Sequence, residues 1–147
     1  MALPIEDYAL VGDRRTGALI GRNGSVDWLC LPRFDSPACF AGLLGGDEHG
    51  HWQLCPVGEY DVSRRYVEAS AVLETTFTTA TGEVTLTDAM PHSDGRSDLV
   101  RRIAGPDLVA AVALELRGKR AQIQDRTCQE ALAAFEQVLR REETPLG

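Results

Sequence analysis

The sequence predicts a mainly β protein with antiparallel strands and a C-terminal amphipathic α-helix. Two observations predict the strands. Apolar and β-branched residues alternate with polar ones, and turn residues such as Asn-Gly separate the alternating runs. A third observation predicts the helix, because the apolar residues change to a helical spacing after residue 127.

The first predicted element is a β-hairpin. Residues 16–20 and 25–29 have strand character and flank the run Gly21-Arg22-Asn23-Gly24. An Asn-Gly pair supplies the positive φ angles that a tight reversal needs. We therefore expect these two strands to pair directly.

Residues 31–50 are predicted to form a loop-rich stretch. Pro32 and Pro37 block regular ladder hydrogen bonding, and several glycines loosen the rest. Within this stretch, residues 38–44 fit one short helical turn.

Strands return after residue 50, and the best pair is formed by residues 71–79 and 83–90. On the first of these strands Leu73, Thr75 and Phe77 share a face, which is typical of a sheet with one solvated face. Further strands are predicted at residues 51–55, 60–66, 100–103 and 109–116, of which the last also fits a helix.

The tail has the pattern of a helix. Thr127-Cys-Gln-Glu130 is a capping box, in which Thr127 and Glu130 each satisfy a backbone donor. Residues 128–142 then form one predicted amphipathic helix, which Pro145 closes. Its apolar stripe consists of Leu132, Phe135, Val138 and Leu139.

The charge balance restricts the class of partner. The chain has 147 residues and a net charge of -7, and residues 118–147 contain equal numbers of acidic and basic side chains. The acidic excess therefore lies entirely in residues 1–117. Because such a domain repels phosphate backbones and anionic lipid, we expect no nucleic acid and no membrane surface as a partner.

Compartment signals favour the cytoplasm. The N-terminus has no basic start followed by an apolar run, and no stretch approaches the length of a membrane span. Without a secretion signal, the cysteines are expected to be free thiols. The sequence contains no C-x-x-C pair, so we expect no structural zinc site. They are Cys30, Cys39, Cys55 and Cys128.

One run of residues is not explained by strand propensity alone: Gly24-Ser-Val-Asp-Trp-Leu-Cys-Leu-Pro-Arg-Phe-Asp-Ser-Pro37. With residues 4–8, Thr87-Asp-Ala-Met-Pro91 and Asp98-Leu-Val-Arg101, it resembles the opening of bacterial glycoside hydrolase family 15 proteins. These are glucoamylases or trehalases that begin with a trehalase-like N-terminal domain. The resemblance covers roughly residues 3–103 and is lost by Gly118.

This resemblance implies the architecture and the class of function. The family's first domain is an antiparallel β sandwich, here partial and truncated, and a large (α/α)6 barrel follows it with both catalytic glutamates. We therefore expect a trehalase-like N-terminal β-sandwich domain at residues 1–117 and a divergent helical tail at residues 118–147. The chain would be a non-catalytic fragment of an α-glucosidic hydrolase, inactive by itself and without a cofactor. Truncation, a frameshift or a gene fusion would each produce it.

Two other functions stay open. The chain could be a stand-alone carbohydrate-binding or protein-interaction module, or a gene remnant with little function of its own. An α-glucoside such as trehalose or a maltooligosaccharide is expected to bind only together with a barrel domain. The apolar stripe of residues 128–142 is expected either to cover the truncated sandwich or to mediate self-association.

The candidate substrate-binding residues are Trp28, Arg33 and Asp35. A guanidinium and a carboxylate can hydrogen-bond sugar hydroxyls, and Trp28 offers an aromatic face. The favoured alternative is that Arg33 and Asp35 form a local ion pair that pins the loop while Trp28 lies in the core.

No catalytic pair and no metal site are expected. Glycoside hydrolysis normally needs two carboxyl groups flanking one bond, and nothing in the spacing of the acids brings two of them together. The acids considered are Glu6, Asp7, Asp13, Asp27, Asp35 and Asp88. As metal ligands, His49, His51 and Cys55, with His92 more distant, are weaker candidates than surface side chains.

Overall fold

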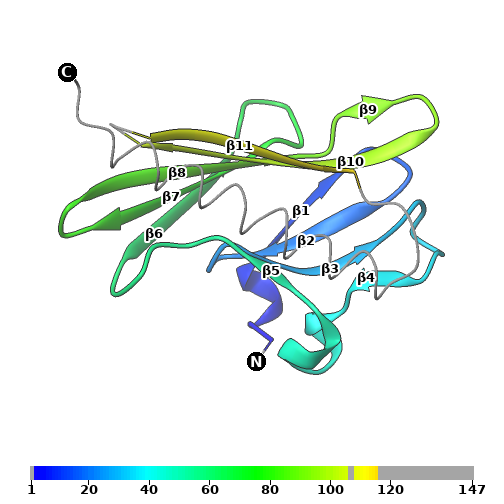
Figure 1. Cartoon of the computed structure of the whole chain (residues 1–147), viewed down its shortest axis with the longest axis horizontal. Coiled ribbons are helices and arrows are strands. Elements are labelled where there is room, and N and C mark those ends of the chain that lie inside the picture. The colour runs from blue at the N-terminus through cyan, green and yellow to red at the C-terminus, as the bar shows by residue number, and fades with distance from the viewer. Residues whose placement is uncertain (1, 106–107, 116–147) are drawn as a thin grey trace, which may run out of the picture.

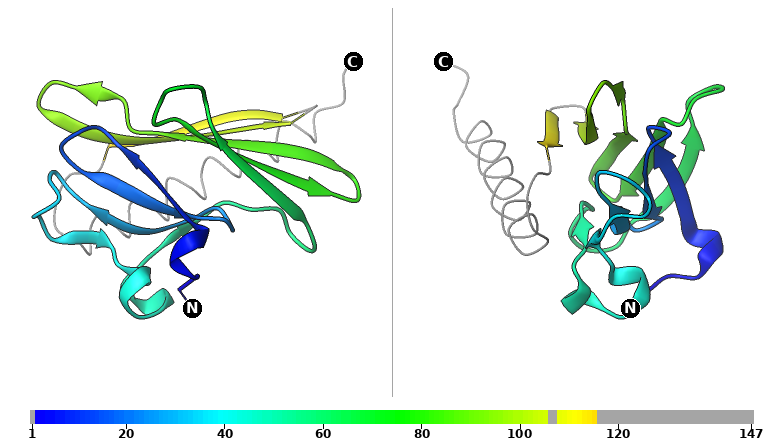
Figure 2. Two further views of the ribbon diagram at one scale, coloured as in Figure 1. Left: turned by 180° about the vertical axis from the view of Figure 1, so that it is seen from behind. Right: turned by 90° about the vertical axis from the view of Figure 1, so that its right-hand side faces the viewer.

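The computed structural model describes residues 2–105 and 108–115, which form two antiparallel β-sheets. Figure 1 shows the blue-to-cyan sheet of the first half of the chain against the green-to-yellow sheet of the second half, and Figure 2 shows the same two layers from other sides. The sandwich fold expected for the front of the chain is therefore present. The predicted helix at residues 128–142 and the tail at residues 118–147 lie outside the described residues.

The first sheet has the strand order β1-β2-β3-β4, and β5 also pairs with β3. Three short 3-10 helices, η1 (Ile5–Asp7), η2 (Gly42–Leu44) and η3 (Asp47–His49), flank it. Its strands are β1 (Tyr8–Gly12), β2 (Gly17–Gly21), β3 (Ser25–Cys30), β4 (Ala38–Phe40) and β5 (Trp52–Gln53).

The second sheet has the order β11-β10-β8-β7-β6, with β9 paired to β10. Its strands are β6 (Asp61–Tyr66), β7 (Leu73–Thr79), β8 (Gly82–Ala89), β9 (His92–Ser93), β10 (Arg96–Gly105) and β11 (Leu108–Glu115). The predicted pairing of residues 71–79 with 83–90 is confirmed by the register of β7 and β8.

The hairpin of β2 and β3 confirms the turn signal in the sequence. The Gly24 N–H donates to the Gly21 carbonyl at 2.9 Å, and Gly24 has a φ of 76°. A Cβ atom at Gly24 would collide with the carbonyl oxygen of Leu54. Gly24 therefore has two reasons to be glycine, its backbone conformation and the close approach of a neighbouring chain segment.

A β-bulge decides which residues of β3 face the core. The register shifts between Leu19 and Ile20, so that Ala18 lies opposite Leu29 and Ile20 lies opposite Val26. These four residues are fully buried. A strand without a bulge would not turn residues 26 and 29 to the same face, because their spacing is odd.

Trp28 is consequently not in the core, and the expectation that placed it there is wrong. It lies opposite Leu19, between the two inward-facing pairs, and both side chains are only partly buried. The alternation of strand faces puts this pair on the outer face of the first sheet. The fully packed tryptophan is Trp52 of β5, which is 5% exposed.

The core is formed by apolar side chains of both sheets. On β7 the predicted inward face is confirmed, because Leu73, Thr75 and Phe77 are all buried. The central cluster contains Val11, Ala18, Ile20, Val26, Leu29, Cys39, Phe40, Trp52, Leu73, Met90 and Leu99.

One predicted element differs from the structure. Residues 38–44 do not form one helical turn, because residues 38–40 form strand β4, whose Phe40 is buried opposite Leu29. The 3-10 helix η2 follows only at residues 42–44. The strand predicted at residues 109–116 is confirmed by β11, which covers residues 108–115 and pairs with β10 along its whole length, so the alternative helix does not form there.

Arg101 of β10 joins the two sheets from inside the core. Its side chain is 0% exposed, and its Nε donates to the Asp88 carboxylate of β8 at 2.7 Å. Its Nη1 donates to the Trp52 carbonyl at 2.9 Å, and its Nη2 donates to the Gly24 carbonyl at 2.7 Å. The guanidinium also lies 4.9 Å from the centroid of the Trp52 ring. One cation therefore connects β8 and β10 of the second sheet with β5 and the hairpin turn of the first.

Candidate functional site

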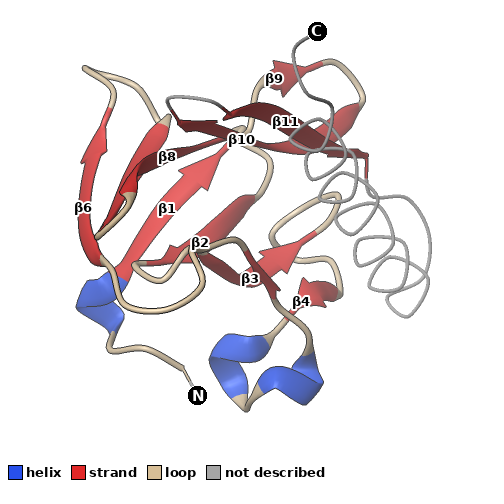
Figure 3. Ribbon diagram, turned by 60° about the vertical axis from the view of Figure 1, so that its left-hand side comes forward, coloured by secondary structure: helices blue, strands red, loops and turns tan. Residues whose placement is uncertain are grey.

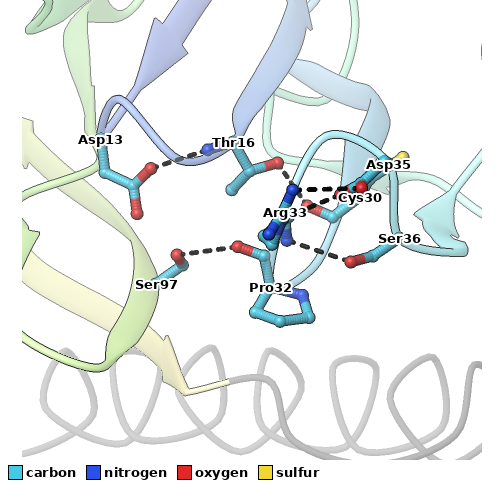
Figure 4. A network of polar contacts seen from close by, with 8 residues as sticks. All are labelled: Asp13, Thr16, Cys30, Pro32, Arg33, Asp35, Ser36 and Ser97. Atoms are coloured by element: carbon cyan, nitrogen blue, oxygen red, sulfur yellow. Dashed lines mark hydrogen bonds and ion pairs between the residues drawn. The ribbon is translucent and has the colours of Figure 1, made fainter.

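The loop between β3 and β4 carries the candidate substrate-binding residues. It runs through a cis Leu31–Pro32 peptide bond and displays Arg33, Phe34 and Asp35 to solvent. Phe34 is 59% exposed, which is unusual for a large apolar side chain on a fixed loop. Figure 4 shows how the surrounding segments hold this loop.

Three hydrogen bonds to its backbone fix the loop, two from the turn between β1 and β2 and one from β10. The Phe34 N–H donates to the Arg15 carbonyl at 3.2 Å, and the Ser97 hydroxyl of β10 donates to the Pro32 carbonyl at 3.4 Å. The Thr16 hydroxyl donates to the Cys30 carbonyl at the start of the loop (Figure 4). Because these bonds use the backbone, the side chains at the tip are left available.

The turn that supports the loop is organised by Asp13. This residue is 3% exposed, and its Oδ1 accepts hydrogen bonds from the Arg15 and Thr16 N–H groups at 2.9 Å each. Burial alone would raise the pKa of Asp13, but the Ser97 hydroxyl and these backbone donors lower it below the ordinary 3.8. Arg14, which lies between Asp13 and Arg15 in the turn, adopts a φ of 75°, a backbone conformation that arginine rarely takes.

Arg33 and Asp35 form a two-pronged ion pair, as the favoured alternative expected. The Arg33 Nε donates to Asp35 Oδ1 at 3.0 Å, and Nη2 donates to Oδ2 at 3.2 Å. Both side chains remain about two-thirds exposed or more, at 68% and 71%. Trp28 takes no part in the hydrogen bonds that hold the loop in the described part of the chain. The role of the three residues toward substrate stays a prediction.

The sequence did not reveal the apolar neighbour of this loop. A Cβ atom at Gly17 would lie 3.3 Å from the Phe34 ring and 2.9 Å from the end of the Leu10 side chain. Gly17 therefore lets Phe34 and Leu10 lie against the backbone of β2. Leu10 is 51% exposed. Because Leu10 and Val11 are consecutive apolar residues, the alternation rule alone could not say which one faces solvent.

Three of the acids considered as catalytic groups, Asp27, Asp35 and Asp88, have separate structural partners. Asp27 accepts hydrogen bonds from the Tyr8 hydroxyl at 2.6 Å and from the Ser25 hydroxyl. Burial and the bond to Asp27 raise the pKa of Tyr8 to about 12. Asp88 is held by Arg101, and Asp35 is held by Arg33. Each of these three carboxylates thus has its own structural partner.

The histidines do not lie on one strand. His49 ends η3, and His51 precedes the short strand β5, so the two side chains do not share a strand face. The cause is the 3-10 turn at residues 47–49. Among the residues that the structure describes, no three His, Cys, Asp or Glu side chains are grouped to hold a metal ion.

Cys30 and Cys55 are free thiols, which confirms the expectation for these two, whereas Cys128 lies outside the described residues. Burial raises the pKa of the Cys30 thiol. In the described part of the chain, no helix is long and apolar enough to span a membrane.

The fold and the loop define a two-sheet β-sandwich domain that displays one fixed polar loop. The sequence model of the family "Trehalase-like, N-terminal" matches residues 1–133, and the chain belongs to this family.

Several trehalases are similar to the chain. It is 44% identical over 88 residues to a trehalase of Mycolicibacterium smegmatis, and to one of Mycobacterium tuberculosis, which is 59% of the chain and 13% of each trehalase. It is 36% identical over 102 residues to trehalase 1 of Sulfolobus acidocaldarius, which is 69% of the chain and 17% of that protein. The chain thus spans only a small part of the length of these relatives. No solved structure matches the chain.

Proposed function

We propose that this chain is the non-catalytic N-terminal β domain of a glycoside hydrolase of the glucoamylase/trehalase type. In this proposal the domain supports a catalytic (α/α)6 barrel that lies outside these residues and acts on an α-glucosidic substrate. The family membership and the similarity to trehalases along a small part of their length support it. The free thiols of Cys30 and Cys55 suit a reducing, cytoplasmic compartment.

The observation that carries the proposal is the fixed display of Arg33, Phe34 and Asp35. Loops that bind ligands are commonly held by a rigid scaffold, because a preorganised group loses less entropy on binding. Here the loop backbone is held by Arg15, Thr16 and Ser97, while the tip side chains face solvent.

The tip offers the groups that a sugar needs. The Arg33–Asp35 pair places a guanidinium and a carboxylate side by side, and both keep unused donors or acceptors for sugar hydroxyls. Phe34 adds an apolar face beside them. We therefore place this loop at the substrate entrance of the enzyme, where it positions the sugar without touching the bond that is cut.

A chimeric enzyme tests this role. The matching segment of the Mycolicibacterium smegmatis trehalase is replaced by that of this chain, and kcat and KM for trehalose are measured. Arg33→Gln and Asp35→Asn should each raise KM by about tenfold, since about 1.4 kcal/mol of binding corresponds to that factor. The control is Arg102→Gln, an exposed arginine of β10 on another part of the domain. Unchanged KM values for both loop variants would reject the placement at the entrance.

The isolated chain separates this proposal from its alternatives. It should hydrolyse neither trehalose, maltose nor starch. Activity that disappears on mutating Asp27, Asp35 or Asp88 would overturn the non-catalytic role. If the chain alone bound trehalose or maltooligosaccharides tightly, a stand-alone carbohydrate-binding module would replace the proposal.

A further inference from the structure

A cavity of about 250 Å³ lies where the edge strands of the two sheets approach each other. Its lining includes Tyr8 of β1, Arg22 after β2, and Arg64, Arg65 and Tyr66 of β6. Figure 3 shows β1 and β6 side by side at this edge. Pockets for drug-sized ligands occupy about 300–1,000 Å³, so this cavity suits a smaller ligand.

The charges around the cavity do not cancel. Arg22 is paired with Asp7 at 3.1 Å, and Arg65 is paired with Glu74 at 2.5 Å. Arg64 has no carboxylate within ion-pairing distance among the residues whose side chains the structure describes. One positive charge is therefore left over at this point of a chain whose net charge is -7.

Arg64 also has hydrogen-bonding capacity to spare. Its Nη1 donates to the Ile20 carbonyl of β2 at 3.2 Å, which fixes the guanidinium at the seam between the sheets. Its remaining N–H groups have no acceptor within the described chain. Burial, followed by the charge of Arg22, lowers the pKa of Arg64. The nearby Asp7 carboxylate acts in the opposite direction. A bound anion would also favour the charged form of Arg64 and oppose the repulsion from Arg22.

The two tyrosines form walls of the cavity and are not its donors. The Tyr66 hydroxyl donates to the Leu10 carbonyl at 2.9 Å, and the Tyr8 hydroxyl donates to Asp27 at 2.6 Å. Because each phenol has only one hydrogen to donate, both are used elsewhere. A ligand in this cavity must therefore be recognised by guanidinium groups, which match the planar, paired oxygens of carboxylates and phosphates.

We propose that the cavity between β1 and β6 binds a small oxyanion, a phosphate group above all, through Arg64 with Arg22 beside it. The phosphate can be free or part of a phosphorylated sugar, since the same guanidinium chemistry recognises both. This site lies at the sheet edge and involves none of the residues of the Arg33–Asp35 loop. It does not depend on the proposed function.

The test is a calorimetric titration of the full 147-residue chain with inorganic phosphate, glucose 6-phosphate and glucose. Binding of phosphate and glucose 6-phosphate with similar affinity indicates a free oxyanion site, and much tighter binding of glucose 6-phosphate indicates a phosphorylated sugar. Either result supports the proposal when added sodium chloride weakens the binding. Failure of both phosphates to bind in the millimolar range, or equal binding of neutral glucose, overturns it.

Two variants assign the binding to this cavity. Arg64→Gln should weaken phosphate binding by about tenfold or more, equivalent to about 1.4 kcal/mol. Arg22→Gln should weaken it without disturbing the bond from Arg64 to Ile20, which covers the case in which Arg64→Gln fails to fold. Arg102→Gln, at an exposed position of β10, should bind as the unaltered chain does. Equal affinity in all three variants overturns the assignment.

Discussion

Arg101 and Asp88 lie directly opposite each other on β10 and β8, and their side chains form an ion pair that is 0% exposed on both sides. Two segments that carry the sequence resemblance, Thr87–Pro91 and Asp98–Arg101, thus meet at one contact. Removing both charges from water is costly, and the guanidinium recovers this cost through the carbonyls of Trp52 and Gly24. The pair therefore serves to fix the relative position of the two sheets.

Replacing Arg101 by Met should destabilise the domain by about 3–5 kcal/mol, because the buried Asp88 carboxylate would lose its partner. The free energy of unfolding from urea titration measures this. The double variant Arg101→Met, Asp88→Leu should cost less than the sum of the two single changes. The exposed pair offers a matched control, since Arg33→Met should cost less than about 1 kcal/mol. Similar costs at both arginines would contradict the structural role of the buried pair.

The two tryptophans are expected to differ in their effect on stability. Trp52→Ala should cost about 3–5 kcal/mol, because it empties a buried site and removes the ring beneath Arg101. Trp28→Ala should cost about 1–2 kcal/mol, because its ring is only partly buried on the outer face. Thermal and urea unfolding of both variants decide this. A larger loss at residue 28 than at residue 52 would contradict the described facing of β3.

The contrast between these residues shows where sequence reasoning succeeded and failed. Alternation correctly identified the inward face of β7, because Leu73, Thr75 and Phe77 follow the strand period without interruption. In β3 the bulge after the turn changes which residues face inward, and no local signal in the sequence marks it. Trp28 was therefore assigned to the core on its residue type alone.

The loop was foreseen in part. Pro32, Pro37 and the glycines predicted a loop-rich stretch at residues 31–50, and the charges of Arg33 and Asp35 predicted the ion pair within it. Its supports could not be foreseen, because Ser97 is distant in sequence and reaches Pro32 only when the two sheets pack. For the same reason the cavity near Arg64 had no counterpart in the sequence. The cavity depends on the approach of β1 and β6, and strands β2 to β5 separate these two strands in the sequence.

Tyr66 is expected to protect the edge of the first sheet. Its hydroxyl accepts from the Leu10 N–H at 3.0 Å and donates to the Leu10 carbonyl at 2.9 Å, so it satisfies both backbone groups of one edge residue. Tyr66→Phe should cost about 0.5–1.5 kcal/mol, a moderate loss because Tyr66 is 44% exposed and water can replace the hydroxyl.

Hydrogen exchange gives the sharper measurement for this change. The Leu10 amide should exchange faster in Tyr66→Phe, whereas the amide of Val26, a residue of β3 between β2 and β5, should not change relative to global unfolding. Unaltered protection at Leu10 would show that the tyrosine does not cap this edge.

The support of the loop should depend on pH through Asp13. The folded structure lowers the pKa of this carboxyl group below its ordinary 3.8, so the folded state binds the proton less tightly than the unfolded state does. The carboxylate therefore stabilises the domain above about pH 4, and this contribution is lost as the pH falls through the lower, folded-state pKa. Asp13→Asn keeps the shape and an acceptor oxygen for the Arg15 and Thr16 N–H groups but removes the charge. At neutral pH it should cost about 1 kcal/mol, the difference between a charged and a neutral acceptor.

The measurement is the free energy of unfolding of both proteins between neutral pH and about pH 2, with Asp94→Asn, at an exposed position, as the control. The difference between the unaltered chain and Asp13→Asn should be constant above pH 4 and shrink below it, because protonation of Asp13 makes the two acceptors alike. For the control, the difference in the free energy of unfolding between the unaltered chain and Asp94→Asn should not shrink in this way below pH 4. A difference that is unchanged down to the lowest pH, or that grows on acidification, would mean that the charge of Asp13 does not stabilise the turn that supports the Arg33–Asp35 loop.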